Sequence, residues 1–407
     1  MNTNLFPAIL LAGPPNCGKS VLAFLLTHHL RQLGIAHYLL RSAPDGEGDW
    51  YLAGQPDIVT TLRALHKRNY SSQFIMHMHN AIMARPLPLM VDIGGRPQGD
   101  QFNLIKACTH SILLYRSEEE RLQWRVMLNE ARLTPIAELR STLSEDEIVS
   151  ERKPYLRGTI SGLERDPGLR KTGLVFGILL ELVAGICSYD AASLEQIHLE
   201  HAPFPVINER ELAGKLSVPV EGERTIWSPG HLAHISNLIL TSKPISIYGR
   251  GPVWLASALA ALTLPESFVI FDARYGWLSP PPLRLLESTN LLANTRVSAD
   301  VNIKVLPFQD QDAWVEIGLP GGTIEPYEIG ITSLPSRVQG GLVLSGKIPR
   351  WLFATLAHYL APNHAWLAVD DPRLSQAIIV SSNSHSHRVG DTIPRLSPSQ
   401  DSLKNRH

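Results

Sequence analysis

The residues with the clearest chemistry lie near the N-terminus, where glycines alternate with polar side chains. Gly13-Pro14-Pro15-Asn16-Cys17-Gly18-Lys19-Ser20 fills the pattern G-x-x-x-x-G-K-[ST], between an apolar run at 8–12 and a helical pattern from residue 21. In such a loop the backbone amides face phosphate oxygens, Lys19 reaches the β and γ phosphates, and Ser20 can hold Mg²⁺. The sequence therefore predicts a site for ATP with Mg²⁺, formed by Gly13, Pro14, Asn16, Cys17, Gly18, Lys19 and Ser20.

Two carboxylates extend this predicted site. Asp92 ends the hydrophobic run Leu89-Met90-Val91-Asp92, where a Walker B acid would hold a water bound to Mg²⁺. Asp45 lies in an acidic, glycine-rich loop after the strand expected at 37–41, at the edge of a parallel sheet where ligands bind. This second loop is either a ligand or metal site or a solvated turn. We predict that Ser20 and Asp92 hold the metal and that Asp45 contributes to cofactor binding.

Four arginines that follow the fourth expected strand allow two interpretations. They match the lid of small P-loop kinases, in which arginines cover the transferring phosphate, or equally the charged face of an exposed helix. The set is Arg116, Arg121, Arg125 and Arg132.

The elements that must position these residues alternate along the first half of the chain. Strands are expected at 8–12, 37–41, 87–92 and 111–115, and helices at 19–32 and through 56–84. This alternation predicts an α/β fold, with a doubly wound parallel-sheet P-loop NTPase domain over residues 1–198. Histidines and prolines near 195–210 then indicate a junction.

Composition sets the limits for the whole chain. Its 407 residues imply several domains, and 44% hydrophobic with 18% charged residues is typical of a globular protein. With 37 Lys and Arg against 38 Asp and Glu, no basic field exists to hold long nucleic acid. The best apolar run, 174–187, is shorter than the ~20 residues of a membrane span. Three scattered cysteines suit a reducing compartment, so we expect a cytoplasmic protein without a membrane segment.

An internal repeat occupies the second half. The run Ser246-Ile247-Tyr248-Gly249-Arg250-Gly251-Pro252-Val253-Trp254-Leu255 matches Val343-Leu344-Ser345-Gly346-Lys347-Ile348-Pro349-Arg350-Trp351-Leu352, and Phe271-Asp272-Ala273-Arg274 matches Asp370-Asp371-Pro372-Arg373. Each repeat is expected to form a strand, a Gly-Pro turn, a helix, a second strand and an acid-x-Arg turn. The tryptophans either stack on a base or pack in the core. We predict α/β repeats at 203–298 and 299–396, before a polar, disordered tail at 397–407.

Several motifs stand out in the repeats. The second repeat contains Gly341-Leu342-Val343-Leu344-Ser345-Gly346, Trp351-Leu352, Asp371-Pro372-Arg373-Leu374, Ala377-Ile378-Ile379-Val380 and Val389-Gly390-Asp391, and the first contains Gly249-Arg250-Gly251-Pro252-Val253-Trp254-Leu255. In these motifs the repeats resemble the CRISPR-associated ring-nuclease family called Csx-three. The N-terminal half resembles the NTPase domain fused to some members. The resemblance implies a Rossmann-like fold, dimeric action, and Mn²⁺-dependent cleavage of cyclic tetra-adenylate, a second messenger of type III CRISPR antiviral defence.

The resemblance also suggests roles for particular residues. Arg250 and Arg373 would bind phosphate, Asp371 and Asp272 would be metal ligands, and His358 or His364 would move a proton. The histidines are offset from the family's position, and Lys347-Ile348 and Ala273 replace its Arg-Gly and Pro. We therefore expect a hydrolase that binds and cleaves cyclic oligoadenylate as one composite site. The alternatives are a silent sensor that controls an ATPase or kinase, and a small-molecule kinase whose C-terminal half drives homo-oligomerisation.

A histidine cluster near the C-terminus leaves one further choice open. His385-Ser386-His387, with His364, would suit a metal, but the serines and the asparagine around it favour a polar loop.

Overall fold

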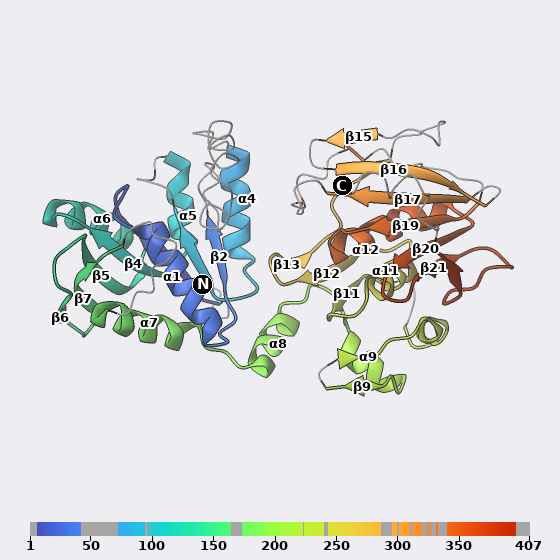
Figure 1. Ribbon diagram of the computed structural model, residues 1–407, viewed down its shortest axis with the longest axis horizontal. Coiled ribbons are helices and arrows are strands. Elements are labelled where there is room, and N and C mark those ends of the chain that lie inside the picture. The colour runs from blue at the N-terminus through green and yellow to red at the C-terminus, as the bar shows by residue number, and fades with distance from the viewer. Residues whose placement is uncertain are drawn as a thin grey trace, which may run out of the picture. The chain divides into compact units, whose positions relative to one another are not determined.

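The protein forms two compact units of mixed α/β structure with parallel strands (Figure 1). One is Met1–Glu200 with Ala273–Gly276, and the other is His201–Asp272 with Trp277–His407. The computed structural model describes residues 6–41, 72–93, 97, 99–163, 173–222, 224–239, 243–285, 295–298, 301–309, 312–319, 324, 326, 331–332 and 340–395. Asp45 and the expected tail at 397–407 lie outside these ranges. The division into three domains, at 1–198, 203–298 and 299–396, stays a prediction.

A seven-stranded sheet is the centre of the first unit. Its strand order is β2-β3-β1-β4-β5-β7-β6, and every neighbouring pair is parallel except β6 with β7. The apolar runs near 8–12, 87–92 and 111–115 all form strands, as expected. The strands are β1 (Ala8–Ala12), β2 (Tyr38–Arg41), β3 (Leu89–Asp92), β4 (His110–Tyr115), β5 (Thr134–Thr142), β6 (Ile148–Glu151) and β7 (Leu156–Ser161).

Helices cover both faces of this sheet because successive side chains of a buried strand point to opposite sides. Ile9 and Leu11 of β1 pack in one hydrophobic cluster with α1 and α7. Ala8, Leu10 and Ala12 pack in another with α4, α5 and α6. The helical segments are α1 (Lys19–Gln32), α4 (Ser72–Met83), the 3₁₀ turn η1 (Gly99–Gln101), α5 (Phe102–Lys106), α6 (Glu118–Glu130), α7 (Leu174–Cys187) and α8 (Ala191–Glu200).

No single described helix is long and apolar enough to span a membrane. By length and composition alone, the bent pair α7 and α8 would pass that test together, with a 51° angle between them.

The second unit has two main sheets. Their orders are β13-β12-β11-β8 and β15-β16-β17-β19-β20-β21-β22, with two short ribbons, β10-β9 and β14-β18. The strands of the first half are β8 (Val206–Asn208), β9 (Val220–Glu221), β10 (Arg224–Thr225), β11 (Ile245–Tyr248), β12 (Phe268–Asp272), β13 (Gly276–Leu278), β14 (Arg284–Leu285) and β15 (Thr295–Ser298). Those of the second half are β16 (Val301–Phe308), β17 (Asp312–Gly318), β18 (Ile331–Thr332), β19 (Leu342–Gly346), β20 (Trp366–Asp371), β21 (Gln376–Ser382) and β22 (Thr392–Pro394).

Helices α11 and α12 pack against each other in the core of the second unit (Figure 1). One hydrophobic cluster contains residues from both helices and from strands of both main sheets, so the two repeats share a core. The helical segments are α9 (Glu209–Lys215), the 3₁₀ turn η2 (Pro229–His231), α10 (Leu232–Ile235), α11 (Val253–Leu262), α12 (Arg350–Leu360) and the 3₁₀ turn η3 (Ala361–Asn363).

The same succession of elements occurs in both repeats. A strand ends at a glycine or just before one, a proline caps the next helix, and a second parallel strand ends in an aspartate. These elements are β11, α11 and β12 in one repeat, and β19, α12 and β20 in the other. Gly249 and Gly346 have φ values of +148° and +143°, a region that favours glycine. The turns expected from the sequence therefore connect the expected strands and helices.

Candidate functional site

The Gly13–Ser20 loop lies between β1 and α1, packed tightly against neighbouring strands. A Cβ on Gly13 would lie 2.1 Å from the carbonyl oxygen of Leu114, at the end of β4. A Cβ on Gly18 would lie 2.6 Å from Cβ of Leu163, which follows β7. Both glycines have positive φ, +139° and +89°, so neither position accepts a larger residue without strain. The loop is thereby fixed at the carboxyl edge of the sheet.

Lys19 points back into this loop. Its Nζ donates hydrogen bonds to the carbonyl oxygens of Gly13, at 2.8 Å, and Pro14, at 2.7 Å. Burial lowers the pKa of Lys19, while the nearby Cys17 and Asp92 act to raise it. The buried ammonium is therefore held by two neutral oxygens, which can be exchanged for a stronger acceptor.

Ser20 and Asp92 meet at the start of α1. The Ser20 hydroxyl donates to Oδ2 of Asp92, and the two oxygens are 2.8 Å apart. Asp92 is buried and ends β3, which runs parallel to β1 with Leu11 opposite Asp92. A hydroxyl and a carboxylate are hard oxygen donors of the kind that Mg²⁺ takes, so these two residues fit the predicted metal. The structure thus brings Lys19, Ser20 and Asp92 together.

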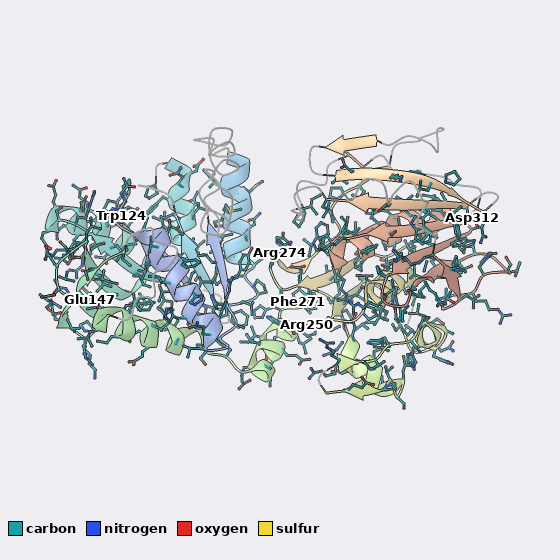
Figure 2. All side chains as sticks on the ribbon, viewed as in Figure 1. Trp124, Glu147, Arg250, Phe271, Arg274 and Asp312 are labelled. Atoms are coloured by element: carbon teal, nitrogen blue, oxygen red, sulfur yellow. The ribbon has the colours of Figure 1, made fainter. Side chains whose placement is uncertain are left out.

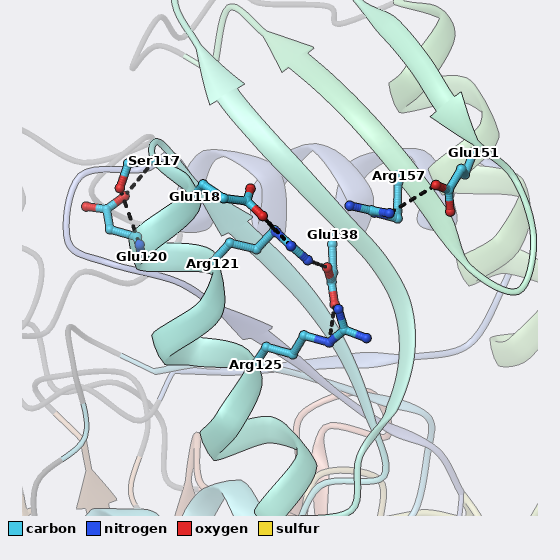
Figure 3. Close-up of polar contacts among 8 residues, drawn as sticks. All are labelled: Ser117, Glu118, Glu120, Arg121, Arg125, Glu138, Glu151 and Arg157. Atoms are coloured by element: carbon cyan, nitrogen blue, oxygen red, sulfur yellow. Dashed lines mark hydrogen bonds and ion pairs between the residues drawn. The ribbon is translucent and has the colours of Figure 1, made fainter.

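The arginines near α6 have partners within their own unit (Figure 3). Nη1 of Arg121 lies 2.7 Å from Oε2 of Glu138 on β5, and Arg121 also pairs with Glu118. Nε of Arg125 lies 3.7 Å from the other Glu138 oxygen. Arg116 pairs with Glu120, whose side chain also forms a capping box with Ser117. These contacts favour the charged-helix interpretation of this cluster over the lid.

In the second repeat, Asp371 is buried at the end of β20. Its Oδ2 accepts a hydrogen bond from Nε1 of Trp254 at 3.1 Å, and its Oδ1 accepts one from the backbone N–H of Arg373 at 2.9 Å. Trp254 belongs to α11 of the first repeat and follows the turn that contains Arg250. The structure therefore joins α11, which begins just after the Arg250 turn of one repeat, to the Asp371–Arg373 turn of the other.

The neighbouring Asp370 is also buried and paired. Its Oδ2 accepts a hydrogen bond from the hydroxyl of Ser345 at 2.8 Å, and Arg395 binds both carboxylate oxygens. These contacts tie β20 to β19 and to the residue after β22. Asp370 therefore stabilises the sheet edge on which Asp371 lies.

The residues predicted from the first repeat lie at one sheet edge. Arg250 is exposed and follows β11, and Asp272 ends β12, the parallel neighbour of β11. Arg274 stacks on the ring of Tyr275, at 4.6 Å from its centroid. Figure 2 labels Arg250 and Arg274, together with Phe271, whose ring packs against Trp277 with 5.4 Å between centroids.

The histidines are placed elsewhere. His358 lies in the last turn of α12, and its Nδ1 is 3.0 Å from the carbonyl oxygen of Ala260 near the end of α11. His364 is buried just before β20, whereas Asp371 ends that strand. Trp366 to Asp371 alone spans about 16 Å at ~3.3 Å per residue. His364 therefore lies before the start of β20 and Asp371 at its end, while His358 lies beside the end of α11.

No group of three or more His, Cys, Asp or Glu side chains that could hold a metal occurs among the described residues of either unit. At Asp371 each carboxylate oxygen accepts one hydrogen bond, which leaves further lone pairs for a cation. The Mn²⁺ ligation expected of Asp371 therefore stays a prediction.

The histidine cluster near the C-terminus forms a polar loop. The hydroxyl of Ser382 donates to the carbonyl oxygen of His387 at 2.6 Å, and the His387 ring stacks on Trp366 with 5.0 Å between centroids. These contacts favour the interpretation of His385 and His387 as part of a polar loop.

Two charged residues escaped the sequence analysis. Glu209 begins α9 and Arg350 begins α12, and their side chains pair beside the Gly249–Pro252 turn. The repeat alignment could have pointed to Arg350, because this residue aligns with the apolar Val253. A charged residue is therefore present in the second repeat where the first repeat has none.

A family model and a curated protein each match part of the chain. A family model described as CRISPR-associated protein (Cas_csx3) matches residues 320–394, which include the span from β19 to β22. A protein of Aquifex aeolicus (strain VF5), named "Uncharacterized protein", is 46% identical over 52 residues, which are 13% of this chain and 46% of that protein. The chain thus spans about half the length of this curated relative. The C-terminal part of the chain is therefore similar to the Cas_csx3 family of CRISPR-associated proteins.

Proposed function

We propose that this is a CRISPR-associated protein with two ligand sites. The first unit would act as a P-loop NTPase domain that binds ATP with Mg²⁺. The second would be a pair of Rossmann-like repeats that binds cyclic oligoadenylate, with cyclic tetra-adenylate as the expected ligand. The family match at 320–394 supports the CRISPR role, and the contact of Ser20 with Asp92 beside Lys19 supports the nucleotide site.

The nucleotide proposal follows from the contacts of the loop. A phosphate oxygen carries more charge than the carbonyls of Gly13 and Pro14, so it would take the Lys19 ammonium from them. The N-terminus of α1 and the loop amides favour an anion at the same place. Ser20 and Asp92 would hold Mg²⁺, which supplies charge neutralisation for the phosphates. A bound phosphate would thus supply the counter-charge for the buried Lys19 ammonium.

Equilibrium dialysis with ATP tests this site. Lys19→Ala should abolish ATP binding, and Asp92→Asn should weaken it in Mg²⁺ but much less in EDTA, because the carboxylate acts through the metal. Lys106→Ala is the matched control, since Lys106 is an exposed lysine that lies over the Phe102 ring. ATP binding by Lys19→Ala at the strength of the unmodified chain would rule out this site.

The proposal for cyclic oligoadenylate depends on the composite edge in the second unit. The hydrogen bond between Trp254 and Asp371 joins the turn of Arg250 to the turn of Arg373. Two guanidinium groups near this edge suit the diester phosphates of a nucleotide ring. The chain has a net charge of −1, so such a local patch must hold the ligand. A tandem repeat also matches a ligand with internal symmetry.

Cleavage of that ligand is a second candidate function, and the family match favours it because residues 320–394 include Asp371 and Arg373. The separation of the histidines and the double hydrogen bonding of Asp371 favour binding without cleavage in a single chain. A sensor that controls ATP turnover in the first unit would use the same binding site.

The variants Asp371→Asn and Arg373→Ala separate these functions. Two quantities are measured for each variant: the linear products formed from cyclic tetra-adenylate, and the rate of ATP turnover. Loss of linear products with unchanged ATP turnover identifies a ring nuclease. No cleavage by the unmodified chain, with loss of ligand-stimulated ATP turnover in the variants, identifies a sensor. Steady ATP use without adenylate binding would instead indicate a small-molecule kinase with an oligomerising C-terminal half.

A further inference from the structure

A buried carboxylate lies at the turn of the first repeat. Glu209 is 3% exposed, and its Oε2 accepts a hydrogen bond from the backbone N–H of Gly251 at 2.7 Å. Nη2 of Arg350 contacts the other oxygen, Oε1. Nη1 of Arg350 donates to the carbonyl oxygen of Gly249 at 2.8 Å. One carboxylate is thus surrounded by a backbone amide and a guanidinium group.

The turn leaves room for this carboxylate because it contains two glycines. A Cβ on Gly249 would lie 2.4 Å from Oε2 of Glu209, and a Cβ on Gly251 would lie 2.8 Å from the same oxygen. The turn leads directly into the ten-residue helix α11, whose N-terminus carries partial positive charge. Nε of Arg350 is buried and has no hydrogen-bond partner among the described residues. Amide, guanidinium and helix end together form a cradle for an oxyanion.

In the second repeat the glycine of the equivalent turn packs against backbone and not against a carboxylate, because a Cβ on Gly346 would lie 2.1 Å from the carbonyl oxygen of Ile317. In the second repeat, the apolar Ile317 of β17 lies opposite the turn glycine Gly346 of β19. In the first repeat, Tyr248 of β11 lies opposite Asn208, and Glu209 is the residue that follows Asn208. In the repeat alignment, Gly251 of the first repeat corresponds to Ile348 of the second, and Arg350 of the second corresponds to Val253 of the first. Burying an ion pair carries a desolvation cost, and an apolar alternative evidently folds. The charges of the first turn therefore call for a role other than closing the fold.

We propose that the Gly249–Gly251 turn with Arg350 is an oxyanion site, filled in the resting chain by the carboxylate of Glu209. When that carboxylate withdraws, the site accepts a carboxylate or a phosphate group of a ligand. Arg350 begins α12 and Gly251 precedes α11, so a bound anion bridges the two repeats. The turn also contains Arg250, which the proposed function assigns to cyclic oligoadenylate, but the test uses only small anions, so its failure and the failure of the proposed function are distinguishable.

Chemical rescue of Glu209→Ala tests the site in the full-length protein. This variant leaves Arg350 without its counter-charge, so the melting temperature of the second unit should fall. Acetate or inorganic phosphate, compared with chloride at equal ionic strength, should restore part of the loss. Glu211→Ala is the matched control, because Glu211 is an exposed acid on the same helix. The unmodified chain and Glu211→Ala should show no such anion-specific rise.

Further variants decide between this site and a general salt effect. Glu209→Ala with Arg350→Ala should lose the rescue, because the guanidinium that binds the anion is gone. If Glu209→Ala does not fold in chloride, its refolding yield in acetate and in phosphate replaces the melting temperature. Rescue by both anions supports a site of phosphate size, and rescue by acetate alone restricts it to carboxylates. Rescue by neither anion, or equal rescue of the double variant, would overturn the proposal.

Discussion

Two tryptophans at equivalent positions show how single residues differ between the repeats. Trp254 and Trp351 each follow a capping proline, and both are almost completely buried. Nε1 of Trp254 donates to the Asp371 carboxylate, whereas Nε1 of Trp351 has no hydrogen-bond partner among the described residues. Of the two roles open from the sequence, core packing accounts for both rings. The hydrogen bond from Trp254 adds a link between the repeats.

This difference predicts unequal costs for the same substitution. Trp254→Phe should lower the free energy of unfolding by about 2 kcal/mol more than Trp351→Phe, because a hydrogen bond to a charged group is worth about 1.5–3 kcal/mol. Trp351→Phe removes a similar ring volume but no bonded donor, so it is the matched control. Urea unfolding followed by circular dichroism measures both. Equal destabilisation would show that the contact with Asp371 contributes no stability.

A buried thiol sets a pH dependence in the first unit. Burial raises the pKa of Cys108 from 9.0 to about 12, and Arg85 opposes this only in part. The folded chain therefore keeps a proton that the unfolded chain releases above pH 9.0. Above that pH the free energy of unfolding should therefore fall, by up to about 1.4 kcal/mol per pH unit, as the pH rises towards 12. Cys108→Ala should make this decline shallower in urea unfolding across the same range, and an unchanged slope would contradict the assignment.

At the scale of elements, local sequence patterns predicted the parts of the fold that depend on neighbours along the chain. β1 and α1 occupy Ala8–Ala12 and Lys19–Gln32, the bounds expected from the apolar run and the helical pattern. The Gly13–Ser20 loop was predicted because its chemistry is carried by eight consecutive residues. Contacts over long separations were not predicted: Trp254 and Asp371 are 117 residues apart, and Arg350 and Glu209 are 141 apart.

The predicted histidines illustrate the same limit. The resemblance pointed to His358 or His364, which precede the Trp366 strand, whereas Asp371 ends that strand, and an extended strand separates its two ends in space. This separation follows from the sequence once the strand is recognised, but the residues of the other repeat that lie beside each end do not.

The link between α6 and β5 gives a prediction at this scale. Arg121 and Glu138 have side chains only 8% and 6% exposed, whereas the Arg125 side chain is 44% exposed. Arg121→Ala should cost about 3–5 kcal/mol, because it leaves the buried carboxylate of Glu138 with only the more exposed Arg125, at 3.7 Å, as its ion-pair partner. Arg125→Ala should cost less than about 1 kcal/mol. Thermal or urea unfolding of the two variants checks this, and similar losses would mean that Glu138 does not depend on Arg121.

At the scale of the whole molecule, each unit has its own hydrophobic core. The clusters around β1 and α1 belong to the first unit, and the clusters around α11, α12 and β20 belong to the second. Separate cores allow each ligand to stabilise its own unit by mass action. Lys19→Ala should therefore abolish stabilisation by ATP and leave stabilisation by cyclic tetra-adenylate measurable. Equal loss of both in differential scanning calorimetry would contradict independent sites.

The most direct test of the central claim is a calorimetric titration of the intact protein with cyclic tetra-adenylate. Linear tetra-adenylate is the matched ligand, and chromatography of the final mixture, with and without Mn²⁺ and ATP, reports any cleavage. We predict saturable binding that favours the cyclic form and weakens in Arg250→Ala and Arg373→Ala. If cyclic tetra-adenylate neither binds nor is converted under any of these conditions, the claim that the second unit recognises cyclic oligoadenylate is wrong.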